Sequence, residues 1–88
     1  MSTQLNNQRH YESIEAETLR QIEKWGVQTH PPLLWVAIVT EEVGEVAQAV
    51  LQGDIQEYRK ELIQIAACCV SALNALDLNA IEVEEPSS

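Results

Sequence analysis

Three glutamates stand within five positions of an otherwise apolar segment, TEEVGEVAQAV, at residues 40–50. On an α-helix, at about 100° per residue, Glu42 and Glu45 lie within about 60° of each other on one flank of a row of valines. Glu41 points away from that row but can approach the same space from the far side. Such glutamates are most often a solvated helix face, yet two carboxylates one turn apart beside apolar side chains can also hold a divalent cation.

A further carboxylate follows the short LQGD connection at residues 51–54. Glu61 flanks an apolar row of the next predicted helix, and Gln64 lies about 60° further round. Because so short a connection requires antiparallel helices, both side chains are expected to converge with the glutamates of the preceding helix. Carboxylates that share a half-buried cleft repel one another and lose hydration, so protons or cations must neutralise them. An all-oxygen set without His or Cys suits Mg²⁺, or alternatively Mn²⁺.

Three helices position these residues, and no strand-like alternation is long enough to compete with them. The first is expected to end at Gly26, the second to cover about residues 32–51 and the third about 55–76. Asp54 and Glu57 are a predicted capping pair for the third helix, in which Glu57 reaches back to the start of the helix. The fold class is therefore all-α.

The second and third helices each carry an apolar row that is predicted to face inward. The row of the second helix comprises Val36, Val39, Val43, Val46, Ala47 and Val50. The row of the third comprises Tyr58, Leu62, Ile65, Ala66, Cys69, Leu73 and Leu76. The opposite side of the third helix is nearly as apolar, so it must be covered on nearly all sides, and two other helices of this size cannot do that.

We therefore expect one helical domain over residues 1–88 whose bundle is completed by another copy of the chain. Its ordered core is expected over about residues 9–77, with a flexible tail over 80–88. The adjacent cysteines, Cys68 and Cys69, are expected to be reduced side chains of that core, since no spacing typical of a zinc site is present.

Charge and composition exclude several kinds of partner. The chain of 88 residues has 14 acidic side chains against five Lys and Arg, a formal charge of −9. The resulting field repels DNA, RNA and anionic membranes, so neither a nucleic-acid polymer nor a membrane is an expected partner. The sequence has no uninterrupted run of about 18 apolar residues and no signal-peptide pattern at its start, which indicates a cytoplasmic protein.

The glutamate motifs resemble those of a known family. Glu42-Val-Gly-Glu45, preceded by Glu41 and followed by Glu61-Leu-Ile-Gln64, is similar to the paired ExxE and ExxD motifs of the MazG-like all-α nucleoside triphosphate pyrophosphohydrolases. The resemblance covers about residues 9–77 and includes the segments KWG, LLWVAIVTEEVGEVAQAV and KELIQIAACCVSALNAL. It implies a helical bundle that assembles as a homodimer or homotetramer. It also implies hydrolysis of ribo- or deoxyribonucleoside triphosphates to the monophosphate and pyrophosphate.

Residue roles follow from the resemblance position by position. It makes Glu42, Glu45 and Glu61 ligands of Mg²⁺, and it makes Glu41 the catalytic residue that orients or deprotonates the attacking water. Gln64 stands where the family has the Asp of its second motif, so it offers a neutral oxygen to the metal and removes one negative charge. Metal affinity is expected to fall as a result.

Substrate contacts must differ from those of the family, because many members bind the phosphates with a segment beyond the third helix. This chain has only LNAIEVEEPSS there. The candidate phosphate-binding cations are Lys24, Arg20, Arg59 and Lys60. Both tryptophans could stack on a nucleobase, although core packing is the more common role, and Trp25 beside the Gly26 break is the better candidate of the two.

Three interpretations stay open on the sequence. The intact glutamates favour a metal-dependent nucleoside triphosphate pyrophosphohydrolase. Gln64 and the missing basic segment favour a weak or inactive MazG-like domain that serves as a nucleotide-binding or oligomeric interaction module. A helical dimer whose glutamates are merely solvated would bind no metal at all.

Overall fold

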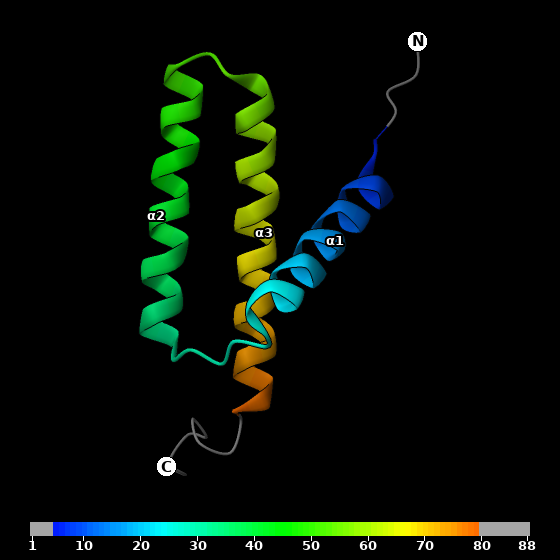
Figure 1. The fold of residues 1–88 in the computed structure, drawn as a ribbon. Coiled ribbons are helices and arrows are strands. Elements are labelled where there is room, and N and C mark those ends of the chain that lie inside the picture. The colour runs from blue at the N-terminus through cyan, green and yellow to red at the C-terminus, as the bar shows by residue number, and fades with distance from the viewer. Residues whose placement is uncertain (1–4, 80–88) are drawn as a thin grey trace.

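The structure, a computed structural model, describes residues 5–79, which form three α-helices and no strand. The helices are α1 (Asn7–Trp25), α2 (Pro32–Leu51) and α3 (Ile55–Leu78), as Figure 1 shows. The all-α prediction is confirmed, and α3 runs two residues beyond its predicted end. The predicted flexible tail, residues 80–88, lies outside the described residues.

Glycines with a left-handed backbone follow the first two helices. Gly26 has a φ of 77°, and its N–H donates to the carbonyl of Ile22 at 2.7 Å. Gly53 has a φ of 70°, and the N–H groups of Gly53 and Asp54 donate to carbonyls of the last turn of α2 at 3.0 Å each. This is the hydrogen-bond pattern of a Schellman motif, which turns the chain sharply back. The turn makes α2 and α3 an antiparallel hairpin.

The side chain of Asp54 begins α3, because its Oδ1 accepts a hydrogen bond from the N–H of Glu57 at 3.0 Å. The reciprocal half of the predicted capping pair is absent, since the N–H of Asp54 already donates to the carbonyl of Ala49. The Glu57 carboxyl group instead contributes to the raised pKa of Glu61, one turn further along α3.

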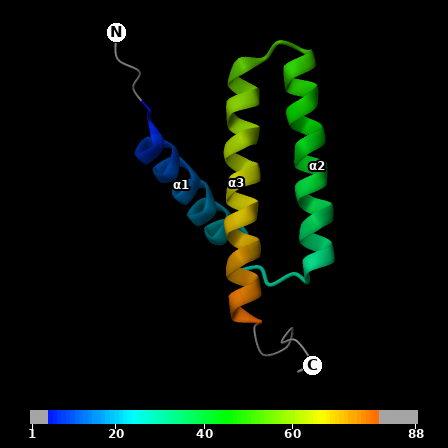
Figure 2. The same ribbon diagram turned by 180° about the vertical axis from the view of Figure 1, so that it is seen from behind.

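α3 is the central helix of the fold. α2 lies antiparallel beside it, whereas α1 crosses it obliquely (Figures 1 and 2). Both helices contact α3, and within residues 5–79 no contact joins α1 to α2. The surface of α3 is therefore divided into a side covered by α2, a side covered by α1 and a third side that no helix covers.

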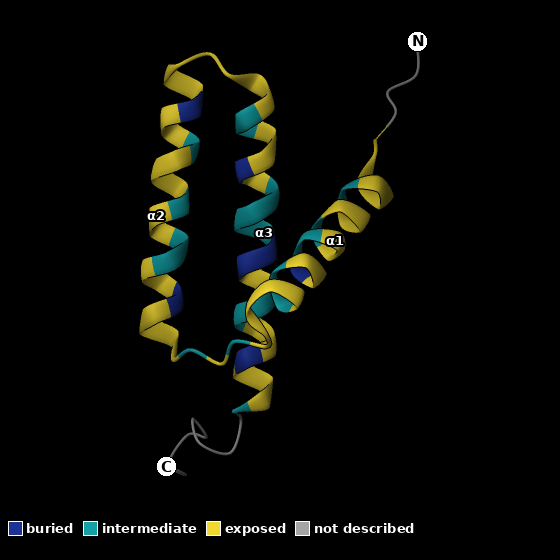
Figure 3. Cartoon of the chain, in the orientation of Figure 1, coloured by how far each residue is buried: buried dark blue, intermediate teal, exposed yellow. Residues whose placement is uncertain are grey.

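The buried core of the single chain is small. It consists of Trp35, Cys68 and Ala75, with Ile38, Val39 and Ala72 packed against them. Figure 3 shows that the buried positions lie in patches on the sides of the helices that face one another. Seventeen large apolar side chains within the described residues stay exposed, so the chain by itself leaves much of its apolar surface in contact with solvent.

The inward rows predicted for α2 and α3 are only partly correct for the single chain: Val39 packs against the core, but most members of both rows are exposed or half-buried. α2 turns Trp35, Glu42 and Ala49 toward α3, and α3 buries Glu61, Cys68 and Ala75. The exposed members of the predicted rows are Val36, Val43, Ala47, Val50, Leu62, Cys69, Leu73 and Leu76. Among these is one of the two predicted core cysteines. The predictions chose the most continuous apolar rows, whereas the observed contact includes two glutamates.

α3 is also long and apolar enough, by length and composition, to span a membrane. A core helix of a soluble protein passes the same test, because both kinds of helix are apolar on most sides. In this fold α3 contacts both other helices and carries a buried carboxyl group, that of Glu61, toward α2.

Replacing Asp54 with Ala is expected to lower the free energy of unfolding by about 1 kcal/mol, because the N–H of Glu57 loses its acceptor. Asp54→Asn keeps a capping oxygen and should stay within a few tenths of a kcal/mol of the wild type. Urea unfolding followed by circular dichroism measures both. Equal losses of unfolding free energy in the two variants would show that the hydrogen bond to the side chain at position 54 does not stabilise the protein.

Candidate functional site

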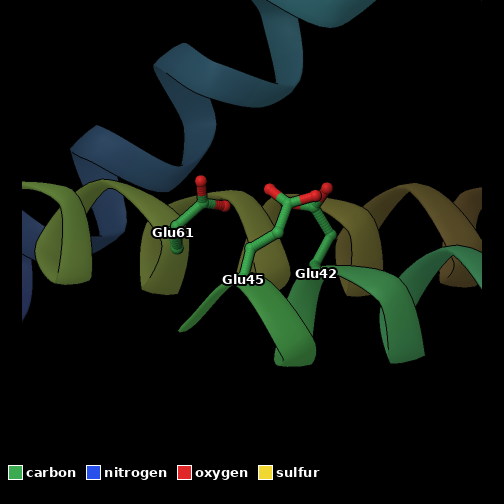
Figure 4. A group of neighbouring side chains, drawn as sticks. All are labelled: Glu42, Glu45 and Glu61. Carbon is green, nitrogen blue, oxygen red and sulfur yellow. The ribbon is translucent and has the colours of Figure 1, made fainter. Parts of the chain in front are cut away.

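Three glutamate side chains from two helices meet on one side of the α2–α3 hairpin (Figure 4). Glu42 and Glu45 lie one turn apart in the middle of α2, and Glu61 lies in the second turn of α3. One carboxylate oxygen from each side chain lies within 4.8 Å of the others. Glu61 is only 5% exposed, Glu42 is half-buried and Glu45 is exposed, so the cluster opens to solvent on the Glu45 side.

Gln64 joins the two more buried carboxylates. With its amide nitrogen turned toward them, it donates to Oε1 of Glu61 and to Oε2 of Glu42 at 3.0 Å each. Residues 61 and 64 are one turn apart on α3, so the helix itself brings the amide to the cluster. The sequence pointed to these four side chains, and the antiparallel hairpin brings them together. Rotating the amide by half a turn would present its oxygen to a cation instead.

The pKa of Glu61 is raised to about 8, chiefly by burial and also by the neighbouring carboxyl groups of Glu57, Glu42 and Glu45. Burial also raises the pKa of Glu42, as do the charges of Glu45 and Glu41. In the absence of a cation, Glu61 therefore keeps its proton at neutral pH. That proton neutralises one carboxylate and so reduces the electrostatic repulsion within the cluster.

The donor set fits a hard divalent cation. Oxygens bound to Mg²⁺ at about 2.1 Å can be no more than about 4.2 Å apart, so a spread of up to 4.8 Å must close by about half an ångström. The exposed side chain of Glu45 has the rotamer freedom to make this movement. The absence of nitrogen and sulfur donors from the cluster favours Mg²⁺ or Mn²⁺ over zinc.

Glu41, the predicted catalytic residue, lies outside the group of three carboxylates. It is exposed on α2, next to Glu42 in the chain, and its charge contributes to the raised pKa of Glu42. The side chain is therefore a neighbour of the cluster that remains in contact with solvent, where a water molecule can reach it.

A hollow lined by three basic side chains and by the carboxylates of Glu17 and Glu57 borders the cluster. It has a volume of about 630 Å³, within the range of small-ligand sites, and it lies between α1 and the first turns of α3. Arg20 contributes from α1, and Arg59 and Lys60 contribute from α3, so three of the five basic side chains of the chain gather here. Gln64 also lines the hollow, which places the hollow directly beside the two carboxylates to which Gln64 donates.

Glu17 is a site residue that is not among those expected from the sequence. Its carboxylate accepts two hydrogen bonds from Arg20, at 2.9 and 2.7 Å, and one from Gln21 at 2.9 Å. The bond from Arg20 holds the pKa of Glu17 below its usual range, and Glu17 in turn raises the pKa of Glu42. The spacing of three and four residues within α1 was a visible signal, but nothing in the sequence indicated which side of α1 faces the cluster.

The remaining predicted substrate contacts lie elsewhere. Lys24 and Trp25 are not among the residues that line the hollow. They pair with each other at the end of α1, where the Lys24 ammonium lies 4.6 Å from the ring centroid of Trp25, which is 56% exposed. Trp35 is 6% exposed and belongs to the core, and its ring centroid lies 5.0 Å from that of His30. Its role in the described fold is therefore packing.

The buried carboxyl of Glu61 should make the metal-free protein less stable as the pH rises. A carboxyl group whose pKa is about 8 when folded and 4.5 otherwise holds its proton only in the folded state between these values. The stability that this proton contributes is complete below pH 4.5 and is lost as the pH rises through 8. Between these values the free energy of unfolding should fall by up to about 1.4 kcal/mol per pH unit. Urea unfolding in EDTA at pH 5, 6, 7 and 8 measures that slope.

The Glu61→Gln variant should flatten the pH dependence, because the amide carries no titrating proton but retains the shape of the side chain. Glu23→Gln, a change at an exposed position of α1, is the matched control and should keep the wild-type slope. A wild-type stability that rises across this pH range, or a slope in Glu61→Gln equal to the wild-type slope, would contradict the assignment of the buried proton.

Comparisons of the chain with protein-family models, with curated proteins and with solved structures find no match. The likeness to the MazG-like family accordingly rests on the motifs in the sequence, and the geometry of the cluster supplies the remaining argument about function.

Proposed function

We propose that this protein is a divalent-metal-dependent nucleoside triphosphate pyrophosphohydrolase. The observation that carries the proposal is the convergence of Glu42, Glu45 and Glu61 within 4.8 Å, directly beside a hollow in which three of the chain's basic side chains gather. A cation held by few carboxylates retains coordination positions that substrate phosphates can fill. The adjacent basic side chains can then hold the phosphates that the metal does not reach.

In this proposal each of the three helices contributes side chains with a different role. A divalent cation on the glutamates supplies neutralisation of the triphosphate and of the charge that develops in the transition state. Arg59 and Lys60 bind phosphate oxygens, and Glu17 holds Arg20 in position with two hydrogen bonds. Glu41 accepts the proton of the attacking water. The water oxygen forms a bond to phosphorus while the bond between the α and β phosphates breaks, which releases the monophosphate and pyrophosphate.

A second candidate function is supported by Gln64. Its amide satisfies Glu61 and Glu42 at 3.0 Å each without an ion, and the raised pKa of Glu61 serves the same metal-free arrangement. A domain in this state would bind nucleotides through Arg20, Arg59 and Lys60 but turn them over slowly or not at all. This is the weak or inactive module that the sequence also left open.

The first test is pyrophosphate release from a panel of ribo- and deoxyribonucleoside triphosphates with Mg²⁺ or Mn²⁺. Glu42→Gln and Glu45→Gln should each lower kcat/KM at least roughly 100-fold while the helical content stays unchanged, because each removes a charged ligand. Glu23→Gln should retain the wild-type rate. Wild-type rates in either site variant, or no release from any substrate by folded protein, would overturn the enzymatic proposal.

The second test restores the acidic residue of the family motif. Gln64→Asp should lower the Mg²⁺ concentration for half-maximal turnover by roughly tenfold, because a fourth carboxylate strengthens the site for a hard cation. Gln64→Asn, which is equally short but neutral, should not lower it. Nucleotide binding measured by calorimetry, without turnover in the wild type but with turnover in Gln64→Asp, would instead establish the inactive module.

A further inference from the structure

A second basic hollow lies between the first turns of α1 and the first turns of α3. Arg9 and His10 line it from α1 and Arg59 lines it from α3, and it is called the Arg9 hollow below. Its volume is about 630 Å³, the size of a small-ligand site. In Figures 1 and 2, α1 diverges from α3 toward its amino-terminal end. The side chains at that end therefore leave space between the two helices.

The Arg9 hollow is distinct from the hollow beside the carboxylate cluster. Neither the three glutamates of the cluster nor Gln64 lines it. Arg59 lines both hollows, whereas Arg9 lines this hollow and not the other, and Arg20 lines the other and not this one. A ligand that fills the Arg9 hollow contacts none of the clustered carboxylates, so it would bind there without a metal.

The charge of the Arg9 hollow favours an anion. Two arginines and a histidine line it, and no acidic residue of the described range does, although the chain has a net charge of −9. Neither Arg9 nor Arg59 forms an ion pair with another residue of the range 5–79, whereas Arg20 is paired with Glu17. Both guanidinium groups of the hollow therefore keep their charge available to a ligand.

The amino-terminal end of α1 adds to the positive potential. Asn6, the residue that precedes the helix, lines the hollow, and its side chain makes no capping hydrogen bond. The first turn of α1 also has no acidic residue. The N–H groups of such a turn carry partial positive charge and favour a nearby anion. This contribution comes from the same wall of the hollow as Arg9 and His10.

The donors of the Arg9 hollow favour a phosphate group over a carboxylate. One guanidinium can satisfy both oxygens of a carboxylate through two parallel hydrogen bonds. The hollow offers two guanidinium groups from different helices, together with the hydroxyl groups of Ser13 and Tyr58. An anion with three terminal oxygens, such as a phosphate monoester, can use donors from both walls at once.

An apolar part completes the lining of the hollow. It consists of Ile55, Leu62 and Ile63, all from α3. Ile55 and Leu62 are 67% and 43% exposed, so an apolar group that packs against them would remove apolar surface from water. The ring of Tyr58 belongs to the same wall and can contact an aromatic group. Inorganic phosphate would use the basic part of the hollow but not this apolar part.

We propose that the Arg9 hollow is a second anion-binding site, which holds a phosphate monoester with a small aromatic or apolar group. Arg9 and Arg59 bind the phosphate oxygens from the two walls, and the apolar side chains of α3 contact the organic group. The site needs neither a metal nor hydrolysis, so it does not depend on the proposed enzymatic function.

Calorimetric titration with phenyl phosphate in EDTA tests the site without a metal on the glutamates. The wild type should bind phenyl phosphate, and Arg9→Gln should raise its Kd at least roughly tenfold, because a charge-assisted hydrogen bond is lost. Arg9 is exposed, so the helical content should not change. Lys24→Gln removes the same charge outside both hollows and should keep the wild-type Kd. No binding by the wild type, or equal weakening in the two variants, would overturn the proposal.

The choice of phosphate is tested by benzoate, which carries a carboxylate on the same ring. Benzoate should bind at least roughly tenfold more weakly than phenyl phosphate, because it cannot use donors from both walls. Inorganic phosphate should also bind more weakly than phenyl phosphate, because it lacks the ring. Binding of benzoate as tight as that of phenyl phosphate would overturn the assignment of a phosphate site.

Amide chemical shifts of the isotope-labelled wild type locate the ligand without any variant. Phenyl phosphate should shift the signals of the first turns of α1 and of the residues around Arg59, and it should leave those of the α2 glutamates unchanged. Shifts centred on Arg20 and Gln64 would place the phosphate beside the cluster and overturn the assignment to the Arg9 hollow.

Discussion

Burial of the Glu61 carboxyl between α3 and α2 is the constraint on which the site depends. A carboxylate that is 5% exposed beside two other glutamates cannot keep its charge unless something neutralises it. The fold offers two solutions in the same place. A proton and the amide of Gln64 satisfy the group without metal, and a divalent cation can replace the proton. The same cluster therefore connects folding stability, pH and metal binding.

The α2–α3 hairpin separates two kinds of chemistry onto its two sides. Charged side chains gather where α1 crosses, and this is also where Arg20, held by Glu17, joins Arg59 and Lys60. Away from it, α2 exposes the apolar side chains of Val36, Val43 and Val50. Because successive residues of an α-helix are turned by about 100°, two neighbours in the sequence can lie on different sides of the hairpin, as Glu42 and Val43 do. A short chain can in this way carry a polar site and exposed apolar side chains on the same two helices.

Much of this arrangement could be predicted from local patterns. The three helices follow from apolar spacing and from Gly26 and Gly53, whose positive φ values end the first two helices. The short LQGD connection requires antiparallel packing, which is why the convergence of Glu42, Glu45 and Glu61 could be anticipated. The rows that face the neighbouring helix within the chain could not, because the most continuous apolar rows are not the ones that α2 and α3 turn toward each other.

The sequence by itself determined the helices, their order, the acidic character of the chain and the residues that could ligate a cation. Each of these depends on neighbours within one or two turns. Tertiary structure alone decided that Glu61 is buried and that Arg20, held by Glu17, lies beside the cluster. It also decided that Trp25 is exposed while Trp35 is in the core. These outcomes depend on how α2 and α1 pack against α3, and that packing joins side chains distant in sequence.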